Sequence, residues 1–103
     1  MKFGLNSKDI DLINAEISSN LGHTKNPRVF IFGSRAKGTH RKYSDIDLLL
    51  KAESYDLEKL SKMDFSKLDI PYVIDFVLDK DLFEEYRQGI TSDLKPFEYQ
   101  NPS

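Results

Sequence analysis

The chain of 103 residues contains no cysteine, which excludes disulfide bonds and zinc sites built from thiolates. It also lacks any apolar stretch near the roughly 20 residues that are needed to cross a bilayer. Residues 1–9 carry neither the basic region nor the apolar core of a signal peptide. We therefore expect a cytoplasmic protein that does not associate with a membrane.

Positive charge is in slight deficit, with 15 Lys and Arg residues against 17 Asp and Glu residues. Surfaces that coat nucleic acids rely on many cations that neutralise phosphates, so we expect no stable nucleic-acid binding. A local basic cluster interrupts the acidic balance, and it consists of Lys37, His40, Arg41 and Lys42. This cluster is either part of a ligand site or an ordinary solvated loop.

The length of the chain allows one compact domain and leaves no room for a second. The sequence shows no internal repeat, low-complexity tract or interdomain linker. Two prolines and several polar residues follow residue 92. We therefore expect a single domain over residues 1–92 and a flexible C-terminal tail over residues 93–103.

Helical and strand patterns alternate along the chain. A first helix, capped by Ser7, is indicated by the spacing of Ile10, Ile13, Ile17 and Leu21. The expected elements that follow are a strand over 28–32, a short helix from Ser34 to Gly38, a strand over 45–51, a helix opened by Ser54 or Asp56, a strand over 72–78, and a closing helix. This order predicts an α/β (α+β) domain, in which helices pack a small mixed sheet. Which strand pairs are parallel stays open.

The closing helix begins with a capping-box pattern formed by Asp81 and Glu84. Its apolar residues Leu82, Phe83 and Tyr86 can belong either to the core or to an interface. We favour the core for all three.

A glycine-serine turn follows the first expected strand. Gly33 allows the backbone to approach phosphate oxygens, Ser34 adds a hydroxyl at the start of a helix, and Gly38 lets the chain return. A Gly-Ser pair is a weak signal when it stands alone. Here ten residues separate it from acidic residues that suit the same ligand, a nucleoside triphosphate with magnesium.

Three aspartates form the acidic part of this pattern. On a strand, Asp45 and Asp47 share one face about 6.6 Å apart, and magnesium offsets the repulsion between such carboxylates. Asp75 shares one face of an apolar strand with Val73 and Val77, where an unpaired charge is costly. The three carboxylates can hold two magnesium ions, and Asp75 can also act as a base.

Ordinary structural roles are open for each of these acidic residues. Ser44 can cap a helix, with Asp45 and Asp47 in its first turn. Asp75 can pair with a lysine or cap a neighbouring turn. The agreement of the three aspartates with the upstream turn favours the metal site.

Two stretches carry a resemblance to a known family, namely Gly33-Ser34-Arg35-Ala36-Lys37-Gly38 and Ser44-Asp45-Ile46-Asp47-Leu48. They resemble the signature of the DNA-polymerase-β-like nucleotidyltransferases. The chain length and the later Asp75 make it similar to the minimal nucleotidyltransferases, which are often antitoxins encoded beside HEPN-domain ribonuclease toxins. The resemblance extends roughly from Arg28 to Leu78.

The resemblance implies roles for particular residues. Gly33 and Ser34 bind the triphosphate, with Lys37 and Ser44 completing the nucleotide site. The catalytic and metal-binding residues are Asp45, Asp47 and Asp75, which hold two Mg²⁺ ions. Lys37 stands where the family commonly has arginine, so the charge is kept but the planar bidentate fork is lost.

The resemblance also implies a reaction and a partner. ATP is the expected donor, and AMP is transferred to a hydroxyl with release of pyrophosphate. Because larger relatives hold the acceptor with extra domains, the acceptor here is expected on a partner, a tyrosine of a HEPN toxin that is silenced by adenylylation. Two alternatives stay open: a non-catalytic antitoxin that inhibits by binding, and a nucleotidyltransferase subunit that acts on a small molecule.

Overall fold

The structure is a computed structural model, and it describes residues 2–97 of the chain. The helices are α1 (Ser7–Ser19), α2 (Gly33–Lys37), α3 (Leu57–Leu60) and α4 (Glu84–Thr91), with 3-10 turns η1 (Phe65–Lys67) and η2 (Asp79–Asp81). The strands are β1 (Arg28–Phe32), β2 (Ile46–Lys51), β3 (Ile74–Leu78) and β4 (Lys95–Pro96). Among the described residues, no helix has the length and apolar character required to span a membrane.

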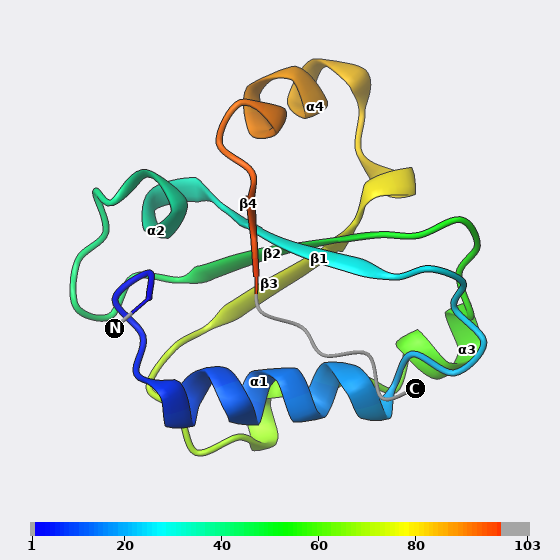
Figure 1. The fold of residues 1–103 in the computed structure, drawn as a ribbon, viewed down its shortest axis with the longest axis horizontal. Helices are drawn as coiled ribbons and strands as arrows, with labels where there is room; N and C mark the ends of the chain where they lie inside the picture. Colours follow the sequence, from blue (N-terminus) through cyan, green and yellow to red (C-terminus); the bar gives the residue numbers. More distant parts are fainter. Residues whose placement is uncertain (1, 98–103) are drawn as a thin grey trace.

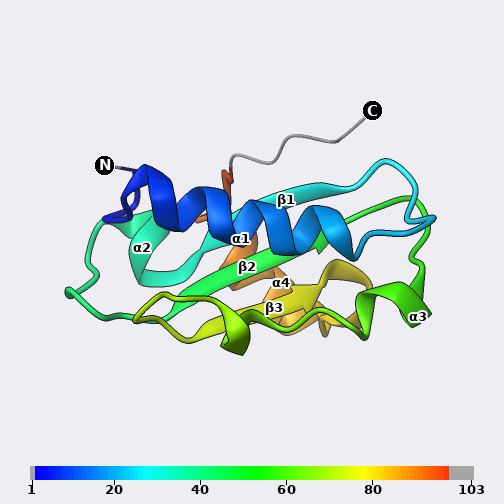
Figure 2. The same ribbon diagram turned by 90° about the horizontal axis from the view of Figure 1, so that it is seen from below.

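The strands form one mixed sheet in the order β3-β2-β1-β4. Strand β1 is antiparallel to both β2 and β4, whereas β2 and β3 are parallel. Helix α1 covers one face of this sheet and α4 lies on the opposite side (Figures 1 and 2). The predicted fold class, a small mixed sheet packed by helices, is confirmed.

The hydrophobic core lies between α1 and the sheet. The α1 residues Ile10, Ile13 and Ile17 are buried, as their helical spacing predicted. On β2, alternation buries Ile46, Leu48 and Leu50 in the same core. The other β2 residues, Asp47, Leu49 and Lys51, therefore project from the face away from α1.

Several predicted boundaries move by one or two residues. Helix α1 is capped by Asn6, whose Oδ1 accepts a hydrogen bond from the Asp9 amide at 2.8 Å, rather than by Ser7. Strand β2 starts at Ile46, because the Ile46 amide is the donor to the Val73 carbonyl at 2.9 Å. Asp45 consequently lies immediately before the strand.

The predicted tail over residues 93–103 was wrong in its first part. Lys95–Pro96 pair with β1 as strand β4, and the Phe97 amide donates to the Val29 carbonyl at 3.0 Å. The Phe97 side chain is 3% exposed and its ring stacks on Phe3 at a centroid distance of 6.4 Å. Burial of this aromatic ring therefore extends the domain to residue 97, and residues 98–103 lie outside the described part.

The predicted closing helix is present as α4, but its predicted capping box and burial were wrong. Its N-cap is Phe83, which provides no side-chain hydrogen bond, and the Asp81 carboxylate instead pairs with Lys80 at 2.9 Å. Within the described part of the chain, no residue of α4 is buried. Phe83 and Tyr86 are 70% and 64% exposed, so the expected core role does not hold for them.

Replacing Phe97 by alanine tests whether β4 belongs to the domain. Loss of a buried ring from a packed core should lower the free energy of unfolding by about 3–4 kcal/mol, as measured by urea denaturation. Phe83→Ala removes an equal volume from an exposed position and should leave stability nearly unchanged. Equal effects of the two substitutions would show that Phe97 is not part of the core.

Candidate active site

The pairing of β2 with β3 brings two of the predicted site residues together. Asp47 and Asp75 are direct partners in the parallel register. Neighbouring strands lie about 4.8 Å apart, and partners in register project to the same face. Asp47 is half-buried, whereas Asp75 and the preceding Asp45 are exposed. The site thus has one sheltered carboxylate and two that are open to solvent.

The electrostatics of this cluster centre on Asp47. Its pKa is raised above the usual 3.8, first because burial disfavours the charged form and then because of the neighbouring Asp75. Asp75 acts through its negative charge and through a hydrogen bond with the Asp47 side chain, and the charge of Asp45 adds to the effect. A cation placed among these carboxylates would reverse this shift and favour the ionised form.

The glycine-serine turn lies against the same carboxylate. Gly33 has a φ of +73°, a conformation that side chains rarely adopt, and a Cβ atom at this position would overlap Oδ2 of Asp47. In the antiparallel register, Phe32 is the direct partner of Asp47. Two motifs that are separated along the sequence therefore meet in the structure, and glycine is required where they meet.

The donor atoms of this cluster suit a hard divalent cation. Within residues 2–97, no three His, Cys, Asp or Glu side chains are already arranged as ligands of one ion. Asp47 and Asp75 are nevertheless direct partners in register, and both offer the oxygen ligands that Mg²⁺ prefers. The chemistry of the carboxylates fits the expected metal.

Asp75 shares one face of β3 with Val73 and Val77, as predicted, but the expected burial of that face was wrong. Val73 is 63% exposed and Asp75 is exposed, so their shared face is not buried. The opposite set, Ile74, Phe76 and Leu78, packs against the core instead. It is the register with Asp47, and not burial, that places Asp75 in the site.

Two predicted nucleotide-binding residues have protein partners. The Lys37 ammonium lies 3.5 Å from the Asp93 carboxylate, in an ion pair between an exposed lysine and a half-buried aspartate. The Ser44 hydroxyl accepts a hydrogen bond from the Arg41 amide at 2.8 Å and closes a tight turn. A phosphate contact by Lys37 would have to compete with Asp93, and Ser44 shapes the entry into β2.

The sequence analysis missed the role of Arg35, which lies in α2 and is 2% exposed. Its guanidinium donates to the carbonyls of Ser44 (2.9 and 3.1 Å) and Phe3 (2.9 Å), and more weakly to that of Lys42 (3.4 Å). The guanidinium carbon also lies 4.7 Å from the centroid of the Tyr72 ring. Burial lowers the pKa of Arg35, but a guanidinium stays charged at neutral pH.

A buried arginine in this place could not be read from a five-residue helix, because one turn is too short to show an amphipathic period. The carbonyls that it binds come from two stretches of chain far apart in sequence, at residue 3 and at residues 42–44. Arg35 positions the Ser44 backbone directly before Asp45, so it is a positioning residue for the carboxylates.

A mixed α+β sheet on which a glycine turn abuts paired carboxylates defines a class of domain suited to binding nucleotides and metals. The sequence profile of one such family, described as "Nucleotidyltransferase domain", matches residues 8–98. This chain belongs to that family, and its membership supports nucleotidyl transfer as its general activity.

A solved structure agrees with this assignment at the level of the fold. It belongs to a Sulfolobus solfataricus protein that is provisionally assigned as a nucleotidyltransferase, with a TM-score of 0.51 and 20% sequence identity. The match covers 93% of this chain and 85% of the other. Among curated protein sequences, none matches this chain significantly.

Replacing Arg35 by methionine should destabilise the domain by about 2–3 kcal/mol, because the carbonyls of Phe3 and Ser44 would lose their charged donor. The free energy of unfolding from urea denaturation measures this loss. Arg41→Met removes the same charge from an exposed side chain and should have little effect. If both variants were equally stable, Arg35 would not be holding the loop.

Replacing Asp47 by asparagine should stabilise the metal-free protein at neutral pH. A carboxyl whose folded-state pKa lies above its unfolded value of 3.8 destabilises the fold as pH rises through that folded pKa. The Tm in EDTA at pH 7 should therefore rise by roughly 2–5 °C, and the gain should shrink as the pH falls through the raised folded-state pKa and vanish below the unfolded value of 3.8.

The exposed Asp69 supplies the control for this variant, since Asp69→Asn removes one negative charge away from the cluster. A lower Tm for Asp47→Asn at neutral pH would mean that the Asp47 carboxylate makes a net favourable contribution, contrary to the repulsion described above.

Proposed function

We propose that this protein is a Mg²⁺-dependent nucleotidyltransferase that moves AMP from ATP to a tyrosine hydroxyl of a HEPN-domain ribonuclease toxin, and so acts as its antitoxin in the cytoplasm. The observation that carries the proposal is the pairing of Asp47 with Asp75 beside the Gly33 turn. Membership of the nucleotidyltransferase family supports the reaction class. The donor, acceptor and partner rest on the resemblance of the sequence motifs.

In this proposal Asp45, Asp47 and Asp75 hold the magnesium ions. Two bound ions would neutralise the triphosphate and polarise the acceptor hydroxyl. The chain itself supplies the carboxylate cluster and the Gly33-Ser34 backbone that approaches the phosphates. Lys37 contributes a cation at the end of the same short helix when a phosphate replaces Asp93 as its partner.

Asp75 is the residue that we assign as the general base. It is exposed beside the half-buried Asp47, so an incoming hydroxyl can reach it from solvent. Asp75 accepts the hydroxyl proton, the acceptor oxygen forms a bond to the α-phosphorus, and the bond from that phosphorus to the β-phosphate bridging oxygen breaks. Pyrophosphate leaves with the electron pair of the broken bond, and AMP stays on the acceptor.

A protein acceptor fits the openness of this end of the sheet. Asp45, Asp75 and the flanking Val73 are all exposed, so a loop of another protein can approach the carboxylates without a lid having to open. The exposed Tyr43, with the Lys42 ammonium 5.4 Å from its ring centroid, borders the same loop. These side chains are available as contacts for the partner that presents the tyrosine.

One observation favours a second candidate, a non-catalytic antitoxin that covers the toxin. Phe83 and Tyr86 form an exposed aromatic pair with ring centroids 6.5 Å apart, a feature enriched where proteins meet. In that case the carboxylates would have no role in neutralisation. Substitution of the carboxylates therefore distinguishes the two candidate functions.

The test is intact-mass spectrometry of the protein encoded beside this one, after incubation with this chain, ATP and Mg²⁺. The expected result is a gain of one or more AMP units, with a rate lowered about 10²-fold or more in Asp45→Asn/Asp47→Asn. A matched control, Asp11→Asn/Asp69→Asn, removes two exposed charges away from the site and should keep full activity.

An unmodified partner in a stable complex with this chain would overturn AMP transfer to that acceptor. Protection of cells from the partner by Asp45→Asn/Asp47→Asn would then establish inhibition by binding. Loss of protection by this variant, with its complex with the partner intact, would show that neutralisation of the partner requires the carboxylates.

A further inference from the structure

The sheet face that carries Asp47 ends, at its other side, in a pair of cations. Asp47, Leu49 and Lys51 project from one face of β2, so Lys51 lies roughly 13 Å along the strand from Asp47. In the antiparallel register, Arg28 of β1 is the direct partner of Lys51. Two like charges that face each other across strands destabilise a sheet, so their pairing calls for an explanation.

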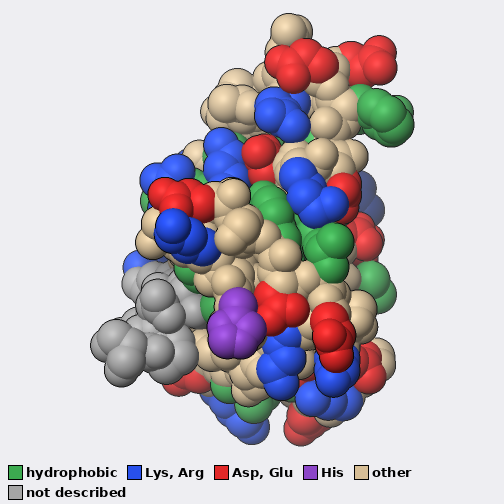
Figure 3. Space-filling model, turned by 90° about the vertical axis from the view of Figure 1, so that its right-hand side faces the viewer, with side chains coloured by type: hydrophobic (Ala, Val, Ile, Leu, Met, Phe, Trp, Pro, Cys, Tyr) green, Lys and Arg blue, Asp and Glu red, His purple; other side chains and the backbone are tan. Residues whose placement is uncertain are grey.

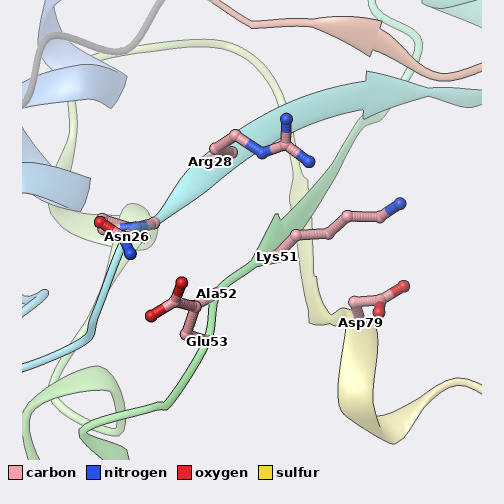
Figure 4. Close-up of a pocket in the computed structure, with 7 residues that line it drawn as sticks. Asn26, Arg28, Lys51, Ala52, Glu53 and Asp79 are labelled. Atoms are coloured by element: carbon pink, nitrogen blue, oxygen red, sulfur yellow. The ribbon is translucent and has the colours of Figure 1, made fainter.

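Arg28 and Lys51 line a cavity of about 610 Å³ at this end of the sheet. Figure 4 shows that their side chains come from neighbouring strands and extend in the same direction, with Asp79 beside them and Glu53 apart. The cavity is large compared with a single phosphate, so a ligand with a substituent can enter.

The carboxylates that border the cavity already have partners. Glu53 lies 3.6 Å from the Lys25 ammonium, and Asp79 lies 3.8 Å from the Arg87 guanidinium. The Asp79 carbonyl also accepts a hydrogen bond from Arg87 at 2.9 Å. Within residues 2–97, neither Arg28 nor Lys51 forms an ion pair.

Both cations instead lie against the same aromatic ring. The Arg28 guanidinium carbon is 5.4 Å, and the Lys51 ammonium 5.6 Å, from the centroid of Phe30. Phe30 follows Arg28 by two residues on β1 and is the direct partner of Leu49, so its ring lies on the same face of the sheet and forms an apolar floor beside the two charges. One ring offsets only part of the repulsion between two cations, whereas an anion placed between them would offset it fully.

We propose that Arg28 and Lys51 form a binding site for a phosphate group, either free phosphate or a phosphate monoester, separate from the carboxylate cluster. A planar guanidinium binds two phosphate oxygens at once, and an ammonium adds a compact charge. The site does not depend on the proposed transfer of AMP.

A compact anion fits this end of the molecule better than a long polyanion does. Basic and acidic side chains are interspersed over the side of the molecule shown in Figure 3, so the cations do not form a continuous basic track. Binding of a nucleic-acid backbone needs several cations in a row. Two adjacent cations over one apolar ring are matched to a single phosphate.

The test compares the wild-type protein with Arg28→Gln/Lys51→Gln at constant ionic strength. Inorganic phosphate should raise the Tm of the wild-type protein saturably and shift the amide resonances of residues 28–30 and 51. The double variant should bind phosphate about tenfold more weakly or worse. Lys8→Gln/Lys62→Gln removes two exposed charges outside the cavity and should bind as the wild type does.

Phenyl phosphate serves as the monoester probe in the same titrations. Tighter binding than inorganic phosphate supports the site and assigns it to an organic monoester, and equal binding supports it and assigns it to free phosphate. No saturable response to either probe would overturn the site. An undiminished response in the double variant would overturn it too, because the phosphate would then lie elsewhere, for instance at the Gly33 turn.

Folding of the double variant is checked by its Tm without phosphate, which should equal or exceed that of the wild type because the cross-strand repulsion is gone. If it unfolds, Lys51→Met keeps the aliphatic stem over Phe30 and removes one charge. Loss of phosphate binding in that variant supports the site, and unchanged binding counts against it.

Discussion

The buried guanidinium of Arg35 holds together the parts from which the site is built. It follows Gly33 and Ser34 directly in sequence, and it binds the carbonyl of Ser44, the residue before Asp45. The same side chain thus sets the distance between the turn and the first aspartate. A buried charge is tolerated only when its hydrogen-bond donors are satisfied. The carbonyls of Phe3 and Lys42 accept hydrogen bonds from the guanidinium, and the Tyr72 ring lies against it, so these groups also stabilise the buried charge. The N-terminal segment is therefore tied to the site although it supplies no group to it.

The sheet brings carboxylates together that repel each other. The parallel register sets Asp47 opposite Asp75, and burial of Asp47 adds to the repulsion, so its pKa rises. A purely structural sheet gains nothing from such a pair. Perturbed carboxylates that lie next to a glycine turn with positive φ are typical of functional sites, because a bound cation would offset their repulsion. The repulsion and the family membership therefore point to the same chemistry, although they are independent observations.

The sequence predicted those features that depend on local pattern. The spacing of Ile10, Ile13 and Ile17 predicted the buried face of α1, and the alternation in β2 predicted that Asp47 points to the face opposite Ile46. Features that depend on distant partners were not predictable. Phe97 lies in a segment rich in polar residues and is buried because β1 and Phe3 receive it. Arg35 looks like any helix-forming arginine until the carbonyls from two distant stretches of chain are in place. Asp75 was placed in the site for a wrong reason, since its face of β3 is exposed and the register with β2 could not be derived.

The division of the sheet into two faces explains how one small domain can carry two polar regions without losing its core. Every second residue of β1, β2 and β3 faces α1 and is apolar, so the core draws on only half of each strand. The other half is free to be charged at both ends, with Asp47 at one and Lys51 at the other. Between them Leu49 is 1% exposed although it projects away from α1, so the two ends are separated by a covered apolar stretch. The cations and the carboxylates therefore lie at opposite ends of this face, and the hydrogen-bonded strands β1 and β2 connect them.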